Sequence, residues 1–434
     1  MSTYWCERAW LPGGIATGVL VEVSDGRITA VTPGAPKRGT VLGGLTLPGF
    51  ANGHSHAFHR ALRGRTHHER GTFWTWRERM YSLAARLDPD SYHRLARGVY
   101  AEMVLAGYTS VGEFHYLHHA PGGKPYASPN AMGEALREAA REAGIRLTLL
   151  DTCYLAGGIG VAPDEVQRRF SDGSARQWAE RVSLLEEDDG FRVGGAIHSV
   201  RAVPGDQLSE VGRGGRSDRP LHVHLSEQRA ENEQCLAAYA MTPTELLDHH
   251  GVVGERLTAV HATHLTPADI GRLGAGRAGA CFCPTTERDL GDGIGPARAL
   301  LDAGVRLGIG SDSNAVVDAF EETRALELDD RLASEQRGRF TVEELLAAGT
   351  DHAAVGWPEV GELAVGAGAD LVTVGLDSVR TAGTEPSGVV FAAGAADVSH
   401  VVVAGREVVR EGGHVLVERP EAVLAGEIEA LWQL

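Results

Sequence analysis

The 434-residue chain has few lysines, no pattern of paired cysteines and no long apolar run. Its only lysines, Lys37 and Lys124, both lie in polar segments with glycine and proline. Its five cysteines are an odd number without the spacing of a disulfide framework or a usual zinc knuckle, so we expect Cys281 and Cys283 to fill a buried strand. No apolar run approaches the ~18 residues of a membrane span, and no basic-then-apolar leader opens the chain. These absences predict a soluble, cytoplasmic protein.

Positive charge is also in deficit, since 41 basic residues face 58 acidic ones and the net charge is −17. The basic stripes of nucleic-acid-binding proteins are therefore not expected. An acidic protein repels anionic substrates at long range, so local arginines must hold any that it binds. We expect a small-molecule substrate, no nucleic-acid or membrane partner, and a homodimer.

Short alternating strands at both ends of the chain flank a long alternation of strands and helices. Residues 18–31 alternate apolar and polar side chains around an Asp25-Gly26 turn, which is a hairpin signal. Residues 361–374 and 398–413 show the same pattern near the other end. We predict that 1–47 and 361–434 form one small β-sandwich, and that 48–360 form a barrel domain.

Eight strand candidates alternate with helices in the central region, the pattern of a (β/α)₈ TIM barrel. The length and the 43% hydrophobic fraction suit such a barrel with an appended unit. The predicted strands are 46–50, 109–116, 145–151, 191–200, 220–226, 257–261, 279–283 and 306–311. The predicted helices are 92–106, 130–143, 176–186, 230–249, 267–273, 298–303, 321–333 and 341–349.

The stretch PGFANGHSH carries two histidines, His54 and His56, one residue apart. If Thr46 to Phe50 enters as a strand, side-chain alternation points both imidazoles the same way. Two imidazoles at the carboxyl end of a strand make half of a zinc ligand set. An isolated pair could equally be two solvated loop histidines, so the prediction depends on further ligands at other strand ends.

Five other predicted strands end in polar residues, and barrel active sites form at the carboxyl ends of the strands. These residues are Glu113, His115, Tyr116, His198, Arg201, His222, His224, Glu227, His261, His264 and Asp312. Alternation puts His222 and His224 on the same side of their strand, so facing does not distinguish them. His224 is the better ligand, because Glu227 follows it where the strand turns over the barrel mouth.

Together, His54, His56, His224 and Asp312 meet the requirement for three or four N/O zinc ligands with a position left for water. Such an ion lowers the pKa of its water toward ~7. Glu227 would then shuttle protons, and His261 would polarise the group under attack. Neither lysine can supply the carboxylated bridge of a two-metal centre, so we expect one Zn²⁺ per chain.

The motifs PGFANGHSH, HVHLSEQ, VHATH and GSDS, in this order, resemble the amidohydrolase superfamily and its mononuclear deaminase branch. The finer motifs HSHAFHRALRG, FWTWRERMY, EFHYLHH, HSVRAV and LGDGIGPA are similar to those of the formimidoylglutamate deiminases. The resemblance covers essentially the whole chain. It implies an amidohydrolase-type barrel that hydrolyses the C=N bond of N-formimino-L-glutamate to give N-formyl-L-glutamate and ammonia in histidine degradation.

The resemblance also implies roles for individual residues. It implies metal ligands at His54, His56, His224 and Asp312, and catalytic groups at Glu227, His261 and Asp312. It implies substrate contacts from His59, Arg77, Tyr116, His198 and Arg201.

Two arginines suit this substrate, because a guanidinium can bind each of its two carboxylates through two hydrogen bonds. Arg77 lies in a segment, 65–86, that is too long for a simple strand-to-helix turn and could fold over the site as a lid. Arg77 could instead pair with Glu78 on the surface, and Tyr116 could belong to the core.

The chain departs from the family at His59, where a glutamine that contacts substrate is usual, and at Asn314, where a histidine is common. Both residues lie beside the expected site, so the exact amidine substrate stays open.

Two other functions also stay open: a deaminase of a cyclic purine- or pyrimidine-like base, and a barrel that has lost catalysis and serves as a binding or assembly protein. A ring without carboxylates has no use for two arginines, and a catalytically dead barrel usually lacks the metal ligands.

Overall fold

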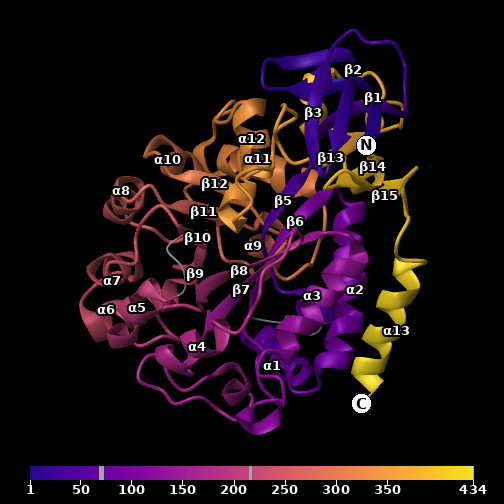
Figure 1. Cartoon of the computed structure of the whole chain (residues 1–434). Coiled ribbons are helices and arrows are strands. Elements are labelled where there is room, and N and C mark those ends of the chain that lie inside the picture. Colours follow the sequence, from indigo (N-terminus) through magenta and orange to yellow (C-terminus); the bar gives the residue numbers. More distant parts are fainter. Residues whose placement is uncertain (68–72, 215–217, 434) are drawn as a thin grey trace.

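The computed structural model describes residues 1–67, 73–214 and 218–433, and Figure 1 shows its barrel beside a second sheet. The barrel is an eight-stranded parallel sheet in which each strand neighbours the next in the chain. Its strands are β5 (Phe50–Ser55), β6 (Tyr108–His115), β7 (Arg146–Cys153), β8 (Phe191–Ile197), β9 (Leu221–Leu225), β10 (Leu257–His261), β11 (Gly279–Phe282) and β12 (Arg306–Ile309). The predicted (β/α)₈ barrel is confirmed.

Backbone hydrogen bonds between the first and last strand segments close the barrel. The Asp312 N–H donates to the His54 carbonyl at 2.9 Å, and the His56 N–H donates to the Asp312 carbonyl at 2.9 Å. Closure therefore brings the segments carrying three of the predicted metal ligands side by side.

Helices surround the barrel in Figure 1. They are α1 (Phe73–Ala84), α2 (Pro89–Leu105), α3 (Ala131–Ala143), α4 (Ala175–Val182), α5 (Gly205–Arg213), α6 (Arg229–Tyr239), α7 (Pro243–His249), α8 (Pro267–Ala275), α9 (Pro284–Leu290), α10 (Ala297–Asp302), α11 (Ala319–Ser334) and α12 (Val342–Gly349). Short 3₁₀ helices lie at η1 (Ala57–Leu62), η2 (Pro121–Gly123), η3 (Gln167–Phe170), η4 (His352–Val355), η5 (Pro386–Phe391) and η6 (Ala395–Asp397). A last helix, α13 (Pro420–Gln433), packs along α2.

Strands from both ends of the chain form one second sheet, in the order β16-β15-β14-β13-β4-β1-β2-β3. They are β1 (Ser2–Leu11), β2 (Gly14–Ser24), β3 (Arg27–Thr32), β4 (Thr40–Pro48), β13 (Leu371–Val374), β14 (Val398–Val403), β15 (Arg406–Arg410) and β16 (Gly413–His414). β4 pairs with β1 on one side and β13 on the other, so the two ends meet at the centre of the sheet. The composite β unit is confirmed, and the domain boundaries near residues 47 and 360 stay a prediction.

The predicted strand 46–50 is wrong, because the chain changes sheets within it. Thr46 lies in β4 of the composite sheet, and the barrel strand starts only at Phe50. Gly49 lies at the junction, where a Cβ atom would fall 2.3 Å from the Thr109 hydroxyl oxygen. His54 therefore lies in β5, and His56 follows directly after it.

The predicted helix 230–249 is also wrong, because α6 and α7 are separate helices. Ala240 ends α6 in the left-handed region at φ 56°, and the Thr242 hydroxyl caps α7 by accepting the Glu245 N–H. Pro243 starts α7, since proline cannot donate a backbone hydrogen bond within a continuous helix. α1, α5, α9 and α13 were not predicted.

Within the part of the chain that the structure describes, no helix is long and apolar enough to cross a membrane. The cytoplasmic location stays a prediction.

Candidate active site

The carboxyl ends of the barrel strands bring the four predicted metal ligands into one buried cluster. Nε2 of His54 and Nε2 of His56 each lie 3.4 Å from Oδ1 of Asp312. Nε2 of His224 lies 3.1 Å from Nε2 of His54. Three imidazoles, two within β5 and β9 and one directly after β5, thus face one carboxylate that follows β12.

The chemistry of this cluster fits a divalent metal ion. Burial lowers the pKa of His54 and His224 well below the ordinary value and that of His56 to about 3, so the rings are neutral. Nδ1 of His56 lies 2.9 Å from the Phe114 carbonyl, to which it can only donate, so its Nε2 keeps a lone pair. Neutral imidazoles and a carboxylate that converge on one point suit a cation between them, and N/O ligands of this kind suit Zn²⁺.

His222 lies on the same strand as His224 but outside this cluster. Its Nε2 donates to the Ala354 carbonyl at 2.9 Å. Side-chain alternation could not show which of the two histidines is the ligand, because both point to the same side of the strand. Their positions along β9 do, because His224 lies nearer to the carboxyl end, where the cluster forms.

His261 and Glu227, the predicted catalytic pair, lie beside the cluster. Nε2 of His261 is 4.0 Å from a Glu227 oxygen and 3.8 Å from an Asp312 oxygen. On its other side, Nδ1 is 3.3 Å from Glu287 of α9. Burial opposes a charged ring, but Glu227, Glu287 and Asp312 together hold the pKa of His261 well above the ordinary value. Glu287 was missed in the sequence, where no motif links it to the other site residues.

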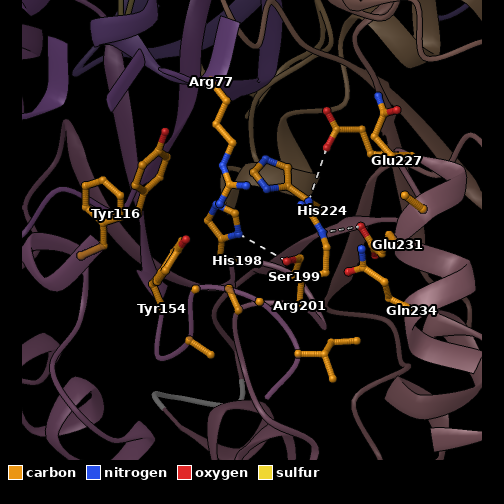
Figure 2. Close-up of a pocket in the computed structure, with 18 of the residues that line it drawn as sticks. Arg77, Tyr116, Tyr154, His198, Ser199, Arg201, His224, Glu227, Glu231 and Gln234 are labelled. Atoms are coloured by element: carbon orange, nitrogen blue, oxygen red, sulfur yellow. Dashed lines mark hydrogen bonds and ion pairs between the residues drawn. The ribbon is translucent and has the colours of Figure 1, made fainter. Parts of the chain in front are cut away.

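A cavity of about 690 Å³ lies over the cluster, and Figure 2 shows its walls. All five predicted substrate residues line it: His59, Arg77, Tyr116, His198 and Arg201. The cavity is also lined by residues to which the sequence analysis gave no role, among them Trp76, Met80, Tyr81, Tyr154, Phe170 and Glu231. These come from loops and helix faces whose spacing resembles that of ordinary core residues.

Arg77 and Arg201 approach the cavity from different elements. Arg77 comes from α1, where its Nε donates to the Tyr81 hydroxyl at 2.8 Å, and Figure 2 shows its guanidinium beside His198. Arg201 follows β8, and its Nε donates to Glu231 at 3.2 Å. Burial, followed by the charge of Arg201 and then other neighbours that include Arg77, keeps the pKa of His198 well below its ordinary value. Arg77 therefore faces the cavity, although residues 68–72 of the predicted lid segment lie outside the described residues.

His59 and Asn314, where the sequence departs from the pattern of the family it resembles, lie in different parts of the site. Nε2 of His59 lies 2.9 Å from the Tyr116 hydroxyl, and both side chains line the cavity. Asn314 lies behind the cluster, where its side-chain amide donates to the carbonyls of His56 at 3.0 Å and Asp312 at 3.2 Å. His59 can influence the substrate, whereas Asn314 supports the backbone of two predicted ligands.

A second buried group, His115, His118 and Asp151, also has ligand atoms close together. Arg181 already binds Asp151 through two hydrogen bonds of 2.8 Å, so that carboxylate has its counter-charge. Glu113, at the end of the same strand as His115, accepts the Ala57 N–H at 2.7 Å. These strand-end residues therefore have structural partners outside the cavity.

The geometry of the barrel and its histidine–aspartate cluster agrees with the comparison to protein families, in which residues 45–408 match the amidohydrolase family. The chain belongs to this family, and the predicted hydrolase class is confirmed. The chain is 40% identical over 442 aligned residues to the formimidoylglutamate deiminase of Pseudomonas aeruginosa, covering 96% of this chain and 97% of that protein.

Two solved structures share the fold across the whole chain. An amidohydrolase from Brucella melitensis has a TM-score of 0.92 and 33% identity, with complete coverage of both chains. A variant of the atrazine chlorohydrolase TrzN from Arthrobacter aurescens, complexed with zinc and atraton, has a TM-score of 0.88 and 24% identity, covering 99% of this chain and 100% of that one.

Proposed function

We propose that this chain is a zinc-dependent deiminase that converts N-formimino-L-glutamate and water to N-formyl-L-glutamate and ammonia, a step of histidine degradation. The observation that carries the proposal is that Arg77 and Arg201 line the same cavity as the histidine–aspartate cluster. The two carboxylates of this substrate need such partners, because the net charge of −17 repels a net anionic molecule at a distance. The 40% identity to a formimidoylglutamate deiminase supports the same substrate.

His54, His56, His224 and Asp312 would hold one zinc ion. When bound, the ion supplies a Lewis acid that makes water nucleophilic near neutral pH. The zinc in the distantly related TrzN structure supports the choice of metal.

Glu227 and His261 would manage the protons. Glu227 follows β9 at the edge of the cavity, so it can take a proton from the attacking water and pass it to the departing nitrogen. His261, held by Glu287 at Nδ1, directs Nε2 toward the centre and would stabilise negative charge on the attacking oxygen. The C–N bond to the terminal nitrogen breaks, the carbon keeps the water oxygen, and ammonia leaves.

The direct test of the proposal is turnover of N-formimino-L-glutamate by purified protein. We expect stoichiometric ammonia and N-formyl-L-glutamate, and about one equivalent of zinc per chain, the number typical of a mononuclear catalytic site. Failure to release ammonia from this substrate would exclude the assignment.

The carboxylate contacts have a separate test in Arg201→Met. We expect kcat/KM for N-formimino-L-glutamate to fall by an amount equivalent to ~2–4 kcal/mol, because a carboxylate loses a charge-assisted partner. Activity on formamidine, an amidine without a carboxylate, should change little. The matched control is Arg213→Met at the exposed end of α5, which should leave both activities unchanged. Equal losses on both substrates would make Arg201 structural.

A deaminase of a cyclic base is the second candidate, and the aromatic cavity wall favours it. Trp76, Tyr154 and Phe170 line the cavity, and flat rings pack well against such side chains. Ammonia release from a purine- or pyrimidine-like base, with none from N-formimino-L-glutamate, would select this function.

A further inference from the structure

Glu231 is a buried carboxylate in the cavity wall to which the mechanism above gives no role. It lies in the first turn of α6 and is 1% exposed. One carboxylate oxygen, Oε2, accepts the Nε–H of Arg201 at 3.2 Å. The other, Oε1, accepts the backbone N–H of Ser226 at 3.2 Å. Glu231 therefore binds Arg201 with one oxygen and the backbone between His224 and Glu227 with the other.

The bond to Glu231 determines which edge of Arg201 remains for a ligand. A guanidinium presents two N–H edges to carboxylates, and Glu231 occupies the Nε side. Nη2, which belongs to both edges, lies 3.8 Å from a Glu227 oxygen, beyond hydrogen-bond length, so the Nη1–Nη2 edge is the one left for a ligand. Figure 2 shows Arg201 between these two carboxylates at the edge of the cavity.

The loop contact affects the other end of the site. Ser226 has a positive φ of 51° and directly precedes Glu227. The left-handed region is uncommon for a residue other than glycine, so the turn needs support from its surroundings. The hydrogen bond from the Ser226 N–H to Glu231 supplies part of that support.

We propose that Glu231 is a positioning residue for the anionic end of the substrate: it holds Arg201 by its Nε edge, so that the Nη groups face a substrate carboxylate. Through Ser226, the same side chain holds Glu227 beside the cluster. The inference rests on the proposed function in one respect, namely that the substrate carries a carboxylate.

Glu231→Gln tests this role because glutamine keeps the shape and loses one acceptor. The amide oxygen can accept only one of the two N–H groups, and the amide nitrogen then faces the other donor. We expect glutarate, a dicarboxylate without the formimino group, to bind at least about tenfold more weakly in calorimetry, the scale of a lost charge-assisted hydrogen bond. The KM for N-formimino-L-glutamate should rise similarly.

The decisive comparison adds Glu231→Gln to Arg201→Met. If Glu231 acts through Arg201, the second change should weaken glutarate binding by less than about threefold in that background, because coupled residues are not additive. The same loss in both backgrounds would overturn the proposal, and so would an unaltered glutarate affinity in Glu231→Gln alone.

Two further variants keep the test independent of folding defects. Glu233→Gln makes the same charge change at an exposed position of α6 and should leave glutarate binding unchanged. Arg201→Lys leaves the contact between Glu231 and Ser226 intact. The single ammonium group of lysine should not bind both Glu231 and a ligand, so the Arg201→Lys protein should bind glutarate as weakly as the Glu231→Gln protein. Wild-type affinity in Arg201→Lys would contradict the positioning role.

The outcomes separate this inference from the proposed function. If glutarate binding depends on both Glu231 and Arg201 but N-formimino-L-glutamate is not turned over, the positioning role stands and the proposed substrate is wrong. Turnover with additive losses would keep the substrate and reject the positioning role. A wild type that does not bind glutarate would reject the positioning role.

Discussion

Glu227 is the residue on which the proposed proton transfers depend. We predict that Glu227→Gln keeps the metal and lowers kcat by ~10² or more, because glutamine cannot carry the proton from water to the leaving nitrogen. Elemental analysis and ammonia release from the same preparation would test both parts. Turnover near that of the wild type would remove Glu227 from the mechanism.

Asn314 connects two of the predicted ligands through their backbones. Its amide donates to the carbonyls of His56 and Asp312, and its own φ of 55° lies in the left-handed region. We predict that Asn314→Gly, which avoids backbone strain, weakens zinc binding by about 10- to 100-fold, as is typical when a partner of metal ligands is lost. Competition with a chromogenic chelator would measure this affinity without reference to activity. Unchanged affinity would show that His56 and Asp312 keep their positions without Asn314.

At the residue scale, the sequence could identify side chains carried by a motif and not the partners that hold them. His54, His56, His224 and Asp312 lie at or just after the carboxyl ends of barrel strands, so barrel geometry alone predicts that they converge. Glu287 and Glu231 lie in helices, where an acidic residue usually faces water. Their contacts with His261 and Arg201 arise only once the strands are closed into a barrel.

At the element scale, two of the errors in prediction lie where proline interrupts an apolar pattern. The run LTLPGF looks like one strand, yet Thr46 belongs to the composite sheet and Phe50 to the barrel. The stretch from Ala230 to His249 looks like one helix, yet Pro243 starts a second. Hydrophobic periodicity indicates that a strand or helix exists, but it does not show to which sheet a strand belongs.

The docking of α13 on α2 depends on a close approach at Gly98. A Cβ atom at Gly98 would lie 2.9 Å from the Leu424 side chain, so glycine makes room for the leucine. Leu424 is 7% exposed. We predict that Leu424→Ala destabilises the protein by ~2 kcal/mol or more through lost burial and a residual cavity. Activity should persist, because α13 does not line the cavity.

The control for this prediction is Leu332→Ala in α11, where the side chain is 76% exposed. Its urea unfolding midpoint should stay within error of the wild type, since alanine is a good helix former and little apolar area is lost. Equal midpoints for the two variants would show that α13 contributes nothing to stability at Leu424.

At the scale of the whole molecule, the alternation of strands and helices was sufficient to predict the barrel, because each parallel strand pairs with the next in sequence. The composite sheet was harder, since β4 and β13 pair although more than 300 residues separate Leu47 from its partner Val372. Local patterns show that both ends form strands, and only the assembled fold shows which strands pair. α13 was missed because its docking surface on α2 is equally distant in sequence.

Buried neutral histidines should make the whole molecule sensitive to acid, and His118 allows a test away from the cluster. Burial, aided by the positive charge of Arg181, lowers the pKa of His118 to about 4, although Asp151 and Asp172 act in the opposite direction. The ordinary value is ~6.5, so between these limits the unfolded chain binds a proton that the folded chain does not. This contribution to stability is full above pH ~6.5 and is lost as the pH falls toward about 4.

We therefore predict that His118→Gln reduces the loss of stability on acidification. His118 contacts the Thr152 carbonyl at 2.9 Å, and the glutamine amide can still donate to that carbonyl. From about pH 7 to about pH 5 the variant should lose ~2 kcal/mol less than the wild type, since one titrating group contributes ~1.4 kcal/mol per pH unit. Urea unfolding midpoints at the two pH values would measure this. His249→Gln, at an exposed position of α7, is the matched control and should follow the wild type. Parallel pH profiles for all three proteins would mean that His118 does not become protonated on unfolding, and that the acid sensitivity arises from other groups.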